Sequence, residues 1–121
     1  MSDKLYPCLW FDNCAKEASL FYGRVFGNFS IDYENQFMVN FRMHGQTFMA
    51  MNGGPQFRPN PSISFFVLFE TASEVEMTWN KLIKGGKILM PLDSYDWSQK
   101  YGWLQDSYGV NWQLALGKFE D

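Results

Sequence analysis

The chain has 121 residues, a formal net charge of −3 and 19% aromatic residues, and this length suits one domain with a core that needs no disulfides or metals. It contains no basic run of the kind that binds nucleic acid or an anionic membrane surface. No apolar run approaches the ~20 residues of a membrane helix. With no targeting pattern at its start, and with two cysteines too close in sequence for a disulfide framework, the chain is expected in the cytoplasm.

The first half reads as a strand, a helix and three strands. A strand is expected at residues 4–11, and Asp12 or Asn13 can cap the helix that follows. Apolar residues in that helix recur at spacings of three and four until Gly27 ends it. His44 and Gly45 form a tight turn between the last two of the three strands. These strands are expected near residues 29–33, 37–43 and 46–52.

The second half repeats this order after residues 53–61, which read as a linker because prolines and glycines interrupt regular structure. Residues 62–69 form a continuous apolar strand, and Ser73 opens a capping box for a helix that Gly85-Gly86 closes. Strands are expected near residues 87–90, 100–105 and 111–116. The chain is therefore predicted to be one domain of two modules, about 4–52 and 62–116, with an internal repeat of about 57 residues.

The most informative stretch is GWLQDSYGVNWQL, residues 102–114, which reads as a complete β-hairpin. Two apolar arms flank a turn in which Asp106 can bond to the backbone and Gly109 can adopt a positive φ. Such a turn fixes the register of the second arm and therefore the face on which Gln113 lies.

The chain resembles the PhnB-like branch of the vicinal oxygen chelate superfamily. The resemblance rests on the strand order, on this hairpin and on the segments PCLWFD, EASLFYGRVFG, MAMNGGPQF and SISFFV. This group is often labelled demethylubiquinone methyltransferase-like, and its superfamily includes glyoxalase I, bleomycin-resistance proteins and extradiol dioxygenases. The resemblance implies an α+β fold, in which two βαβββ modules form an eight-stranded cup around a site, usually in a homodimer.

Methyl transfer itself has little support in the sequence. The usual enzyme binds its donor on a doubly wound sheet, where a glycine-rich turn follows the first strand. Here Phe11-Asp12-Asn13-Cys14 follows the first strand, and Gly53-Gly54 opens no helix. The sequence therefore argues against the methyltransferase label as a description of the chemistry.

The resemblance also implies four metal-ligand positions, which His or Glu occupy in metal-dependent members. They fall here at Pro7, at Met49 or Met51, at Ser64 or Phe66, and at Gln113. None is a histidine, carboxylate or thiolate, the ligands that divalent ions favour. We therefore expect neither a metal nor another cofactor.

Three other residues invite catalytic readings. His44 suits an exposed turn better than general-base chemistry. A helix dipole could lower the pKa of Cys14, but no histidine is expected beside it, so an incidental cysteine is favoured. Asp106 is better explained by its turn than by acid–base work.

What remains is a cup with mostly uncharged polar and aromatic walls. Alternation along the strands predicts a shared inward face, and rings are expected at its rim. Ser64 and Gln113 could orient a ligand by hydrogen bonds while rings and methionines bury its body. The same side chains could instead fill the cup. The inward residues are Leu9, Phe11, Met49, Met51, Ser64, Phe66, Asn111 and Gln113, and the rim residues are Phe57, Trp97, Tyr101 and Trp103.

These residues leave several functions open. The favoured one is metal-free binding of a small, partly apolar or aromatic molecule in the cup. The alternative is an enzyme of the superfamily, either with a displaced metal or with Tyr101, Asp106 or Glu70 moving a proton. A dimerising accessory protein with a filled cup is the third.

Self-association is expected from the resemblance and from the aromatic content, which is high enough to leave an apolar face uncovered in a monomer. Each site could be built from one chain or from two that exchange halves. The linker with Pro55, Pro59 and Pro61 is where an exchange would pivot.

Overall fold

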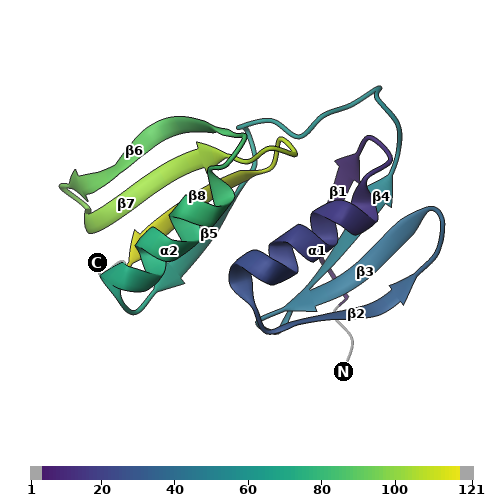
Figure 1. Cartoon of the computed structure of the whole chain (residues 1–121), viewed down its shortest axis with the longest axis horizontal. Coiled ribbons are helices and arrows are strands. Elements are labelled where there is room, and N and C mark those ends of the chain that lie inside the picture. Colours follow the sequence, from purple (N-terminus) through teal and green to yellow (C-terminus); the bar gives the residue numbers. More distant parts are fainter. Residues whose placement is uncertain (1–3, 118–121) are drawn as a thin grey trace. The chain divides into compact units, whose positions relative to one another are not determined.

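The structure is a computed structural model and describes residues 4–117. The chain divides at Pro59–Asn60 into two compact units. Each unit holds a four-stranded sheet with one helix across it (Figure 1). No helix among residues 4–117 is long and apolar enough to cross a membrane.

The first unit has the element order β1 (Cys8–Phe11), α1 (Ala15–Phe26), β2 (Phe29–Glu34), β3 (Met38–Met43) and β4 (Gln46–Asn52). Its sheet has the strand order β1-β4-β3-β2, in which only the β1–β4 pair is parallel. His44 (φ 49°) and Gly45 (φ 82°) form the expected two-residue turn, because both φ values are positive as a type I′ turn requires.

The start of α1 differs from the expectation that Asp12 or Asn13 caps it. The N-cap is Cys14, whose side chain makes no capping bond. Asn52, at the end of β4, accepts a 2.9 Å hydrogen bond at Oδ1 from the Ala15 backbone N–H instead. The cap is therefore a tertiary contact, which local sequence signals do not reveal.

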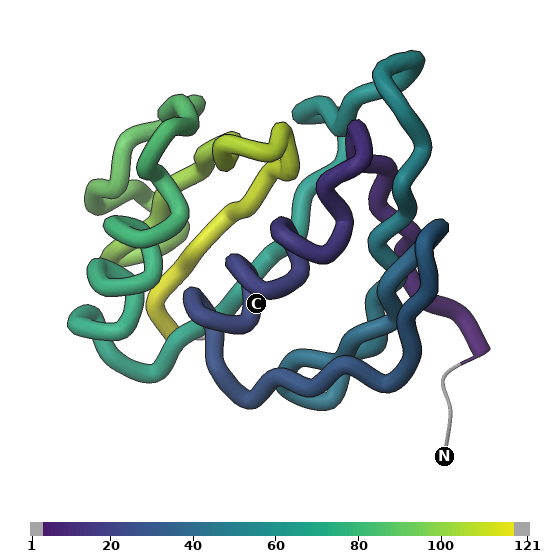
Figure 2. Tube along the Cα trace, turned by 45° about the vertical axis from the view of Figure 1, so that its right-hand side comes forward, coloured from purple at the N-terminus to yellow at the C-terminus, as the bar shows by residue number. Residues whose placement is uncertain are grey.

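The second unit has the element order β5 (Ser64–Phe69), α2 (Ala72–Leu82), β6 (Lys87–Tyr95), β7 (Ser98–Gln105) and β8 (Asn111–Leu116). Its sheet repeats the first topology as β5-β8-β7-β6, with β5 and β8 parallel. The two-module α+β architecture is therefore confirmed. Figure 2 traces each strand–helix–strand crossover, in which the helix lies along its own sheet.

The capping box of α2 lies two residues before the expected Ser73. Thr71 is the N-cap and accepts from the Glu74 backbone N–H at 3.1 Å, while the Glu74 carboxylate accepts from the Thr71 backbone N–H at 3.2 Å. Either residue could begin such a box in the sequence. The box that forms is the one at Thr71, and Val75, Trp79 and Leu82 of the helix are buried.

Strand β6 is longer than expected and irregular. It was predicted to end at Met90 but continues to Tyr95, and its pairing with β7 shifts register three times along its length. Pro91, which suggests a break in sequence, sits in this edge strand, where a missing N–H is tolerated. Bulges of this kind bend and twist a strand.

Each sheet has one face under its own helix and one face that we call the open face, which no helix of the same unit covers in the described residues. In the second unit, Trp112, Leu114 and Leu104 are buried on the helix-covered face. Gly102 belongs there because a Cβ would lie 2.5 Å from the Trp79 ring. Strand alternation then places Tyr101, Trp103 and Gln113 on the open face.

Candidate functional site

Three polar side chains form a hydrogen-bonded relay on the open face of the second unit. The Tyr101 hydroxyl on β7 donates to Gln113 Oε1 on β8 at 2.5 Å. Gln113 Nε2 donates to Ser64 Oγ on β5 at 2.7 Å. Because β8 lies between β7 and β5, the relay crosses three strands through the central glutamine.

The register that produces this relay depends on the β7–β8 turn. Asp106 Oδ1 accepts from the backbone N–H groups of Tyr108 at 2.8 Å and Val110 at 3.0 Å. Its Oδ2 accepts from Trp112 Nε1 at 2.9 Å. Gly109 has a φ of 94°, as the hairpin reading requires. The turn role of Asp106 is therefore confirmed, and the bond to Trp112 adds a contact that the sequence reading missed.

Aromatic rings surround Tyr101, the residue at which the relay begins. Phe66 stacks on Tyr101 with ring centroids 6.3 Å apart, and Tyr95 and Trp97 each meet Tyr101 edge-on at 5.6 Å. Tyr95 and Trp97 also stack on each other at 5.0 Å. Trp97 was expected at a rim, whereas Tyr95 was missed because the sequence reading ended its strand at Met90. The irregular course of β6 carries Tyr95 to this place.

Burial beneath this ring cluster raises the pKa of Tyr101, and the neighbouring Tyr95 hydroxyl raises it further. Tyr101 is 4% exposed. A neutral phenol is a donor, which matches its bond to the Gln113 carbonyl oxygen. The environment of Tyr101 thus favours positioning the glutamine over acting as a base near neutral pH.

Two further polar atoms on this face have no hydrogen-bond partner within the described part of the chain. Trp103 Nε1 and Asn111 Oδ1 are both buried and unpaired. Trp103 lies opposite Gln113 in the β7–β8 pairing, and Asn111 lies opposite Ser64 in the β5–β8 pairing. An unmade hydrogen bond on a buried group costs about 1–3 kcal/mol, and such groups call for an explanation.

The first unit brings together a different set of residues from the one expected. The β1–β4 register pairs Leu9 with Ala50, whereas Met49 pairs with Cys8 and Met51 with Trp10. Leu9 and Phe11 therefore lie on the helix-covered face, and Met49 and Met51 lie on the open face. The expected shared face was wrong for β1 because its weak alternation left the register undetermined by one residue.

Trp10 accounts for the NGGPQF motif. Its Nε1 donates to the Gly54 carbonyl at 2.8 Å, and its ring meets Phe57 edge-on at 5.0 Å. A Cβ on Gly53 would lie 2.3 Å from the indole. Phe57, expected at a rim, is 65% exposed and packs on Trp10. The glycines of this motif thus make room for the Trp10 ring.

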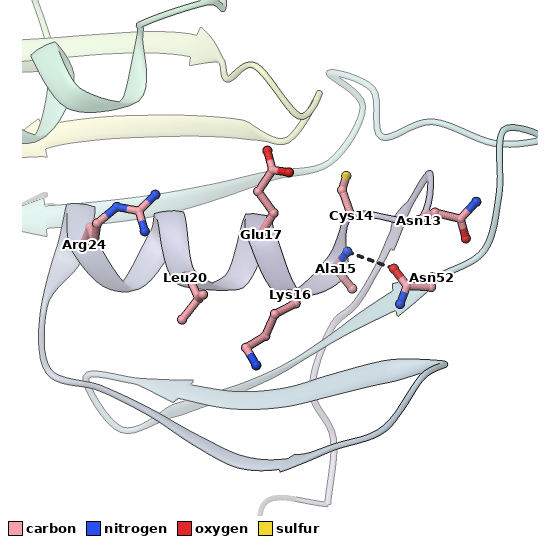
Figure 3. A pocket seen from close by; sticks show the side chains of 8 residues that line it. All are labelled: Asn13, Cys14, Ala15, Lys16, Glu17, Leu20, Arg24 and Asn52. Atoms are coloured by element: carbon pink, nitrogen blue, oxygen red, sulfur yellow. Dashed lines mark hydrogen bonds between the residues drawn. The ribbon is translucent and has the colours of Figure 1, made fainter.

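A hollow in the first unit lies along α1 (Figure 3). This pocket has a volume of about 480 Å³. Its walls are chiefly the exposed side chains of one helix, and it contains none of the predicted site residues. The lining residues are Asn13, Cys14, Ala15, Lys16, Glu17, Leu20, Arg24 and Asn52.

Cys14 in this pocket does not have the activated thiol that a helix dipole could have produced. Partial burial raises its pKa, and the carboxylates of Glu17 and Asp12 raise it further. A backbone hydrogen bond acts in the opposite direction without reversing the shift. His44 is likewise a turn residue, because its exposed ring bonds through Nε2 to the Phe26 carbonyl at 2.9 Å.

The implied metal-ligand positions do not fit a divalent ion. Both ends of the Gln113 amide are already bonded, to Tyr101 and Ser64, and Pro7 and the two methionines offer no oxygen or imidazole donor. Among residues 4–117, no group of three or more His, Cys, Asp or Glu side chains is placed to hold a metal.

Comparison with known structures defines the class. The chain is 14% identical to a glyoxalase/bleomycin resistance protein from Albidiferax ferrireducens T118 (TM-score 0.69; 93% of this chain and 97% of that chain covered) and 20% identical to a glyoxalase-related enzyme from Fulvimarina pelagi (TM-score 0.64; 95% and 89%). At these identities the similarity establishes the fold alone. The two βαβββ units have the glyoxalase/bleomycin resistance fold.

The family follows from two closer matches. A family profile described as 3-demethylubiquinone-9 3-methyltransferase matches residues 3–115. The PhnB protein from Bacillus cereus is 36% identical, with a TM-score of 0.86, and the match covers 95% of this chain and 100% of that one. The chain belongs to this PhnB-like family. No curated protein matches it.

The family name does not describe chemistry that this fold supports. Each described sheet contains a single parallel strand pair and carries one helix. A nucleotide-type methyl donor is usually bound on a doubly wound parallel sheet with a glycine-rich first turn. The described turn after β1 contains no glycine. The Trp10 ring packs against Gly53, and its Nε1 donates to the Gly54 carbonyl.

Proposed function

We propose that the chain binds a small, partly apolar or aromatic molecule without a metal, on the open face of the second unit. The observation that carries the proposal is the relay through Gln113, which holds a polar group in one orientation among aromatic rings. Ligand sites typically combine apolar walls with a few positioned polar groups. Ser64 would contact the polar part of the ligand, and Phe66 its apolar part.

Partial exposure of this face supports the proposal. Phe66 is 44% exposed and Leu68 is 49% exposed, although both belong to an apolar strand. Exposed apolar side chains beside an ordered polar group are typical of surfaces that bind something. A tightly filled face would leave β5 buried.

An NMR titration of the ¹⁵N-labelled chain with a library of small aromatic compounds tests the proposal. We expect the shifts to gather at the amides of Ser64 and Gln113 and at the indole N–H of Trp103. Ser64→Ala weakens binding about three- to tenfold, since one hydrogen bond is lost. Ser30→Ala, at an exposed serine on β2, is the matched control and leaves binding unchanged.

The result against the proposal is a library that shifts no resonance on this face, or one that binds equally well to the Ser64→Ala variant. Metal analysis of the purified protein tests the metal-free part separately. A stoichiometric divalent ion would contradict it, because Gln113 and Ser64 are weak ligands without a carboxylate or imidazole beside them.

We also propose that the chain forms a homodimer. Support comes from large apolar side chains in both units that are more than half exposed and that a second copy could cover. They include Tyr33, Phe37, Ile63, Met77 and Ile88. Sedimentation or size-exclusion measurements at micromolar concentration are expected to report a dimer, and a monomer would contradict the proposal.

We further propose a cytoplasmic location, which the two free thiols, Cys8 and Cys14, fit.

A further inference from the structure

The relay has a direction, and that direction decides which polar group a ligand must carry. Tyr101 donates to Gln113 Oε1, which fixes the orientation of the amide. Gln113 Nε2 must then donate, and Ser64 Oγ receives its proton. Ser64 is the acceptor in this bond, which leaves its own hydroxyl proton free to donate, and no hydrogen bond among residues 4–117 uses that proton. The relay therefore ends in an unused donor.

A second unused donor lies on the other side of Gln113. Trp103 Nε1 carries a proton that no described atom accepts, and an indole nitrogen has no other role in hydrogen bonding. Ser64 on β5 and Trp103 on β7 flank β8, the strand of Gln113. Two donors thus stand on either side of the glutamine on one sheet face.

The electrostatics of the same face disfavour an anion. Asn111 Oδ1, an unpaired acceptor, lies opposite Ser64 and would repel a carboxylate. Lys100, a neighbouring cation on β7, is bonded to Glu76 on α2 at 2.8 Å, on the helix-covered side. A charged ligand would find no oppositely charged side chain among these groups, and burying an unpaired charge costs far more than burying a neutral group.

Building on the proposed function, we propose that the ligand carries a neutral carbonyl oxygen, as in a ketone, ester or amide, which accepts from the Ser64 hydroxyl and from Trp103 Nε1. The apolar or aromatic part of the molecule then packs against Phe66. Such a ligand gives both protein donors an acceptor. A ligand that carries only donors would leave the Ser64 hydroxyl and Trp103 Nε1 without one.

Three probes of similar size separate the alternatives: acetophenone is a neutral acceptor, benzoate an anionic acceptor and benzylammonium a cationic donor. Each is titrated to about 10 mM, a range that covers weak fragment binding. We expect acetophenone to shift the Trp103 indole resonance and to bind at least about tenfold more tightly than the two ions. Ser64→Ala and Trp103→Phe each weaken acetophenone about three- to tenfold, while Ser30→Ala does not.

The failures are distinguishable. If benzoate or benzylammonium binds this face as tightly as acetophenone, the carbonyl inference is overturned and the binding function stands. If acetophenone binds there but Ser64→Ala and Trp103→Phe leave its affinity unchanged, the two assigned donors are wrong. If none of the three probes shifts Ser64, Trp103 or Gln113 resonances, the carbonyl inference is overturned, and the proposed binding function fails as well if the aromatic library also shifts no resonance on this face.

Discussion

The indole of Trp112 donates a 2.9 Å hydrogen bond to the carboxylate of Asp106, and both side chains are buried, at 2% and 3% exposure. The contact joins the second arm of a hairpin to its own turn. It therefore ties the register of β8 to the turn that precedes it. Because side chains alternate along a strand, a slip of one residue would move Gln113 to the helix-covered face.

The first prediction concerns this contact. Asp106→Asn replaces an acceptor oxygen with an N–H₂ group and sets a donor against the donors that surround it. We expect the free energy of unfolding to fall by about 2–4 kcal/mol, measured by urea denaturation. Asp96→Asn, in an exposed turn, is the matched control, with an expected change within about 0.5 kcal/mol. Equal stability of the two variants would contradict the role assigned to Asp106.

A second prediction concerns Gly53 under the Trp10 ring. Gly53→Ala forces the indole to move, because the new Cβ would lie 2.3 Å from it. We expect a loss of about 1–3 kcal/mol in stability. In a double-mutant cycle the cost shrinks when Trp10→Leu has already removed the ring. Additive effects would show that the glycine is required for another reason.

The third prediction uses the raised pKa of Tyr101. The folded phenol resists ionisation, whereas the unfolded one ionises near pH 10. Stability from this group is therefore complete below about pH 10 and is lost as the pH rises through the folded pKa, since the unfolded state then binds fewer protons. Tyr101→Phe is expected to lessen that alkaline loss.

Urea denaturation at several alkaline pH values, with absorbance titration of the phenols, makes this measurement. Tyr33→Phe is the matched control, because Tyr33 is 58% exposed. The same alkaline loss of stability in the wild type and in Tyr101→Phe would rule out the assignment to Tyr101.

The fourth prediction concerns the Cys14 thiol, whose pKa is raised by burial and by Glu17 and Asp12. In a Cys8→Ser background, alkylation by iodoacetamide is expected to be slower near pH 8 than that of an unstructured cysteine peptide, because less thiolate is present. Glu17→Gln removes a negative charge and is expected to speed the reaction. A thiol more reactive than the peptide would contradict the environment described for Cys14.

The fifth prediction tests the direction of the relay. In Gln113→Glu the carboxylate accepts from both Tyr101 and Ser64, so the Ser64 proton is no longer available to a ligand. We expect acetophenone affinity to fall about tenfold or more, and the preference between acetophenone and benzylammonium to move toward the cation. Gln36→Glu, at an exposed loop position, controls for the added charge. An unchanged affinity would show that the relay does not govern ligand choice.

Local sequence signals predicted most of the fold because the turns identify themselves. His44-Gly45 and Asp106 to Gly109 have the chemistry that their backbone angles require, so the hairpins and the faces of β8 followed correctly. β1 has neither a turn nor clear alternation, and Leu9 and Phe11 were assigned to the wrong face. The cap of α1 was missed because Asn52, which provides it, lies 37 residues from Ala15.

The candidate site was partly visible in the same way. The residue types at Ser64 and Gln113 marked them as polar positions among apolar strands. Their hydrogen bond to each other and the anchoring by Tyr101 depend on strand order, which pairs residues 49 and 12 positions apart in the chain. The ring of Tyr95 depends on bulges in β6, for which the sequence carries no clear signal. Their role in binding stays a prediction.

The irregular pairing of β6 has a consequence for the behaviour of the chain in solution. This strand forms one edge of its sheet, and a regular edge offers a ladder of unpaired N–H and C=O groups to any passing strand. Three register shifts and Pro91 interrupt that ladder. The distortion that carries Tyr95 onto Tyr101 therefore also protects the sheet against edge-to-edge aggregation.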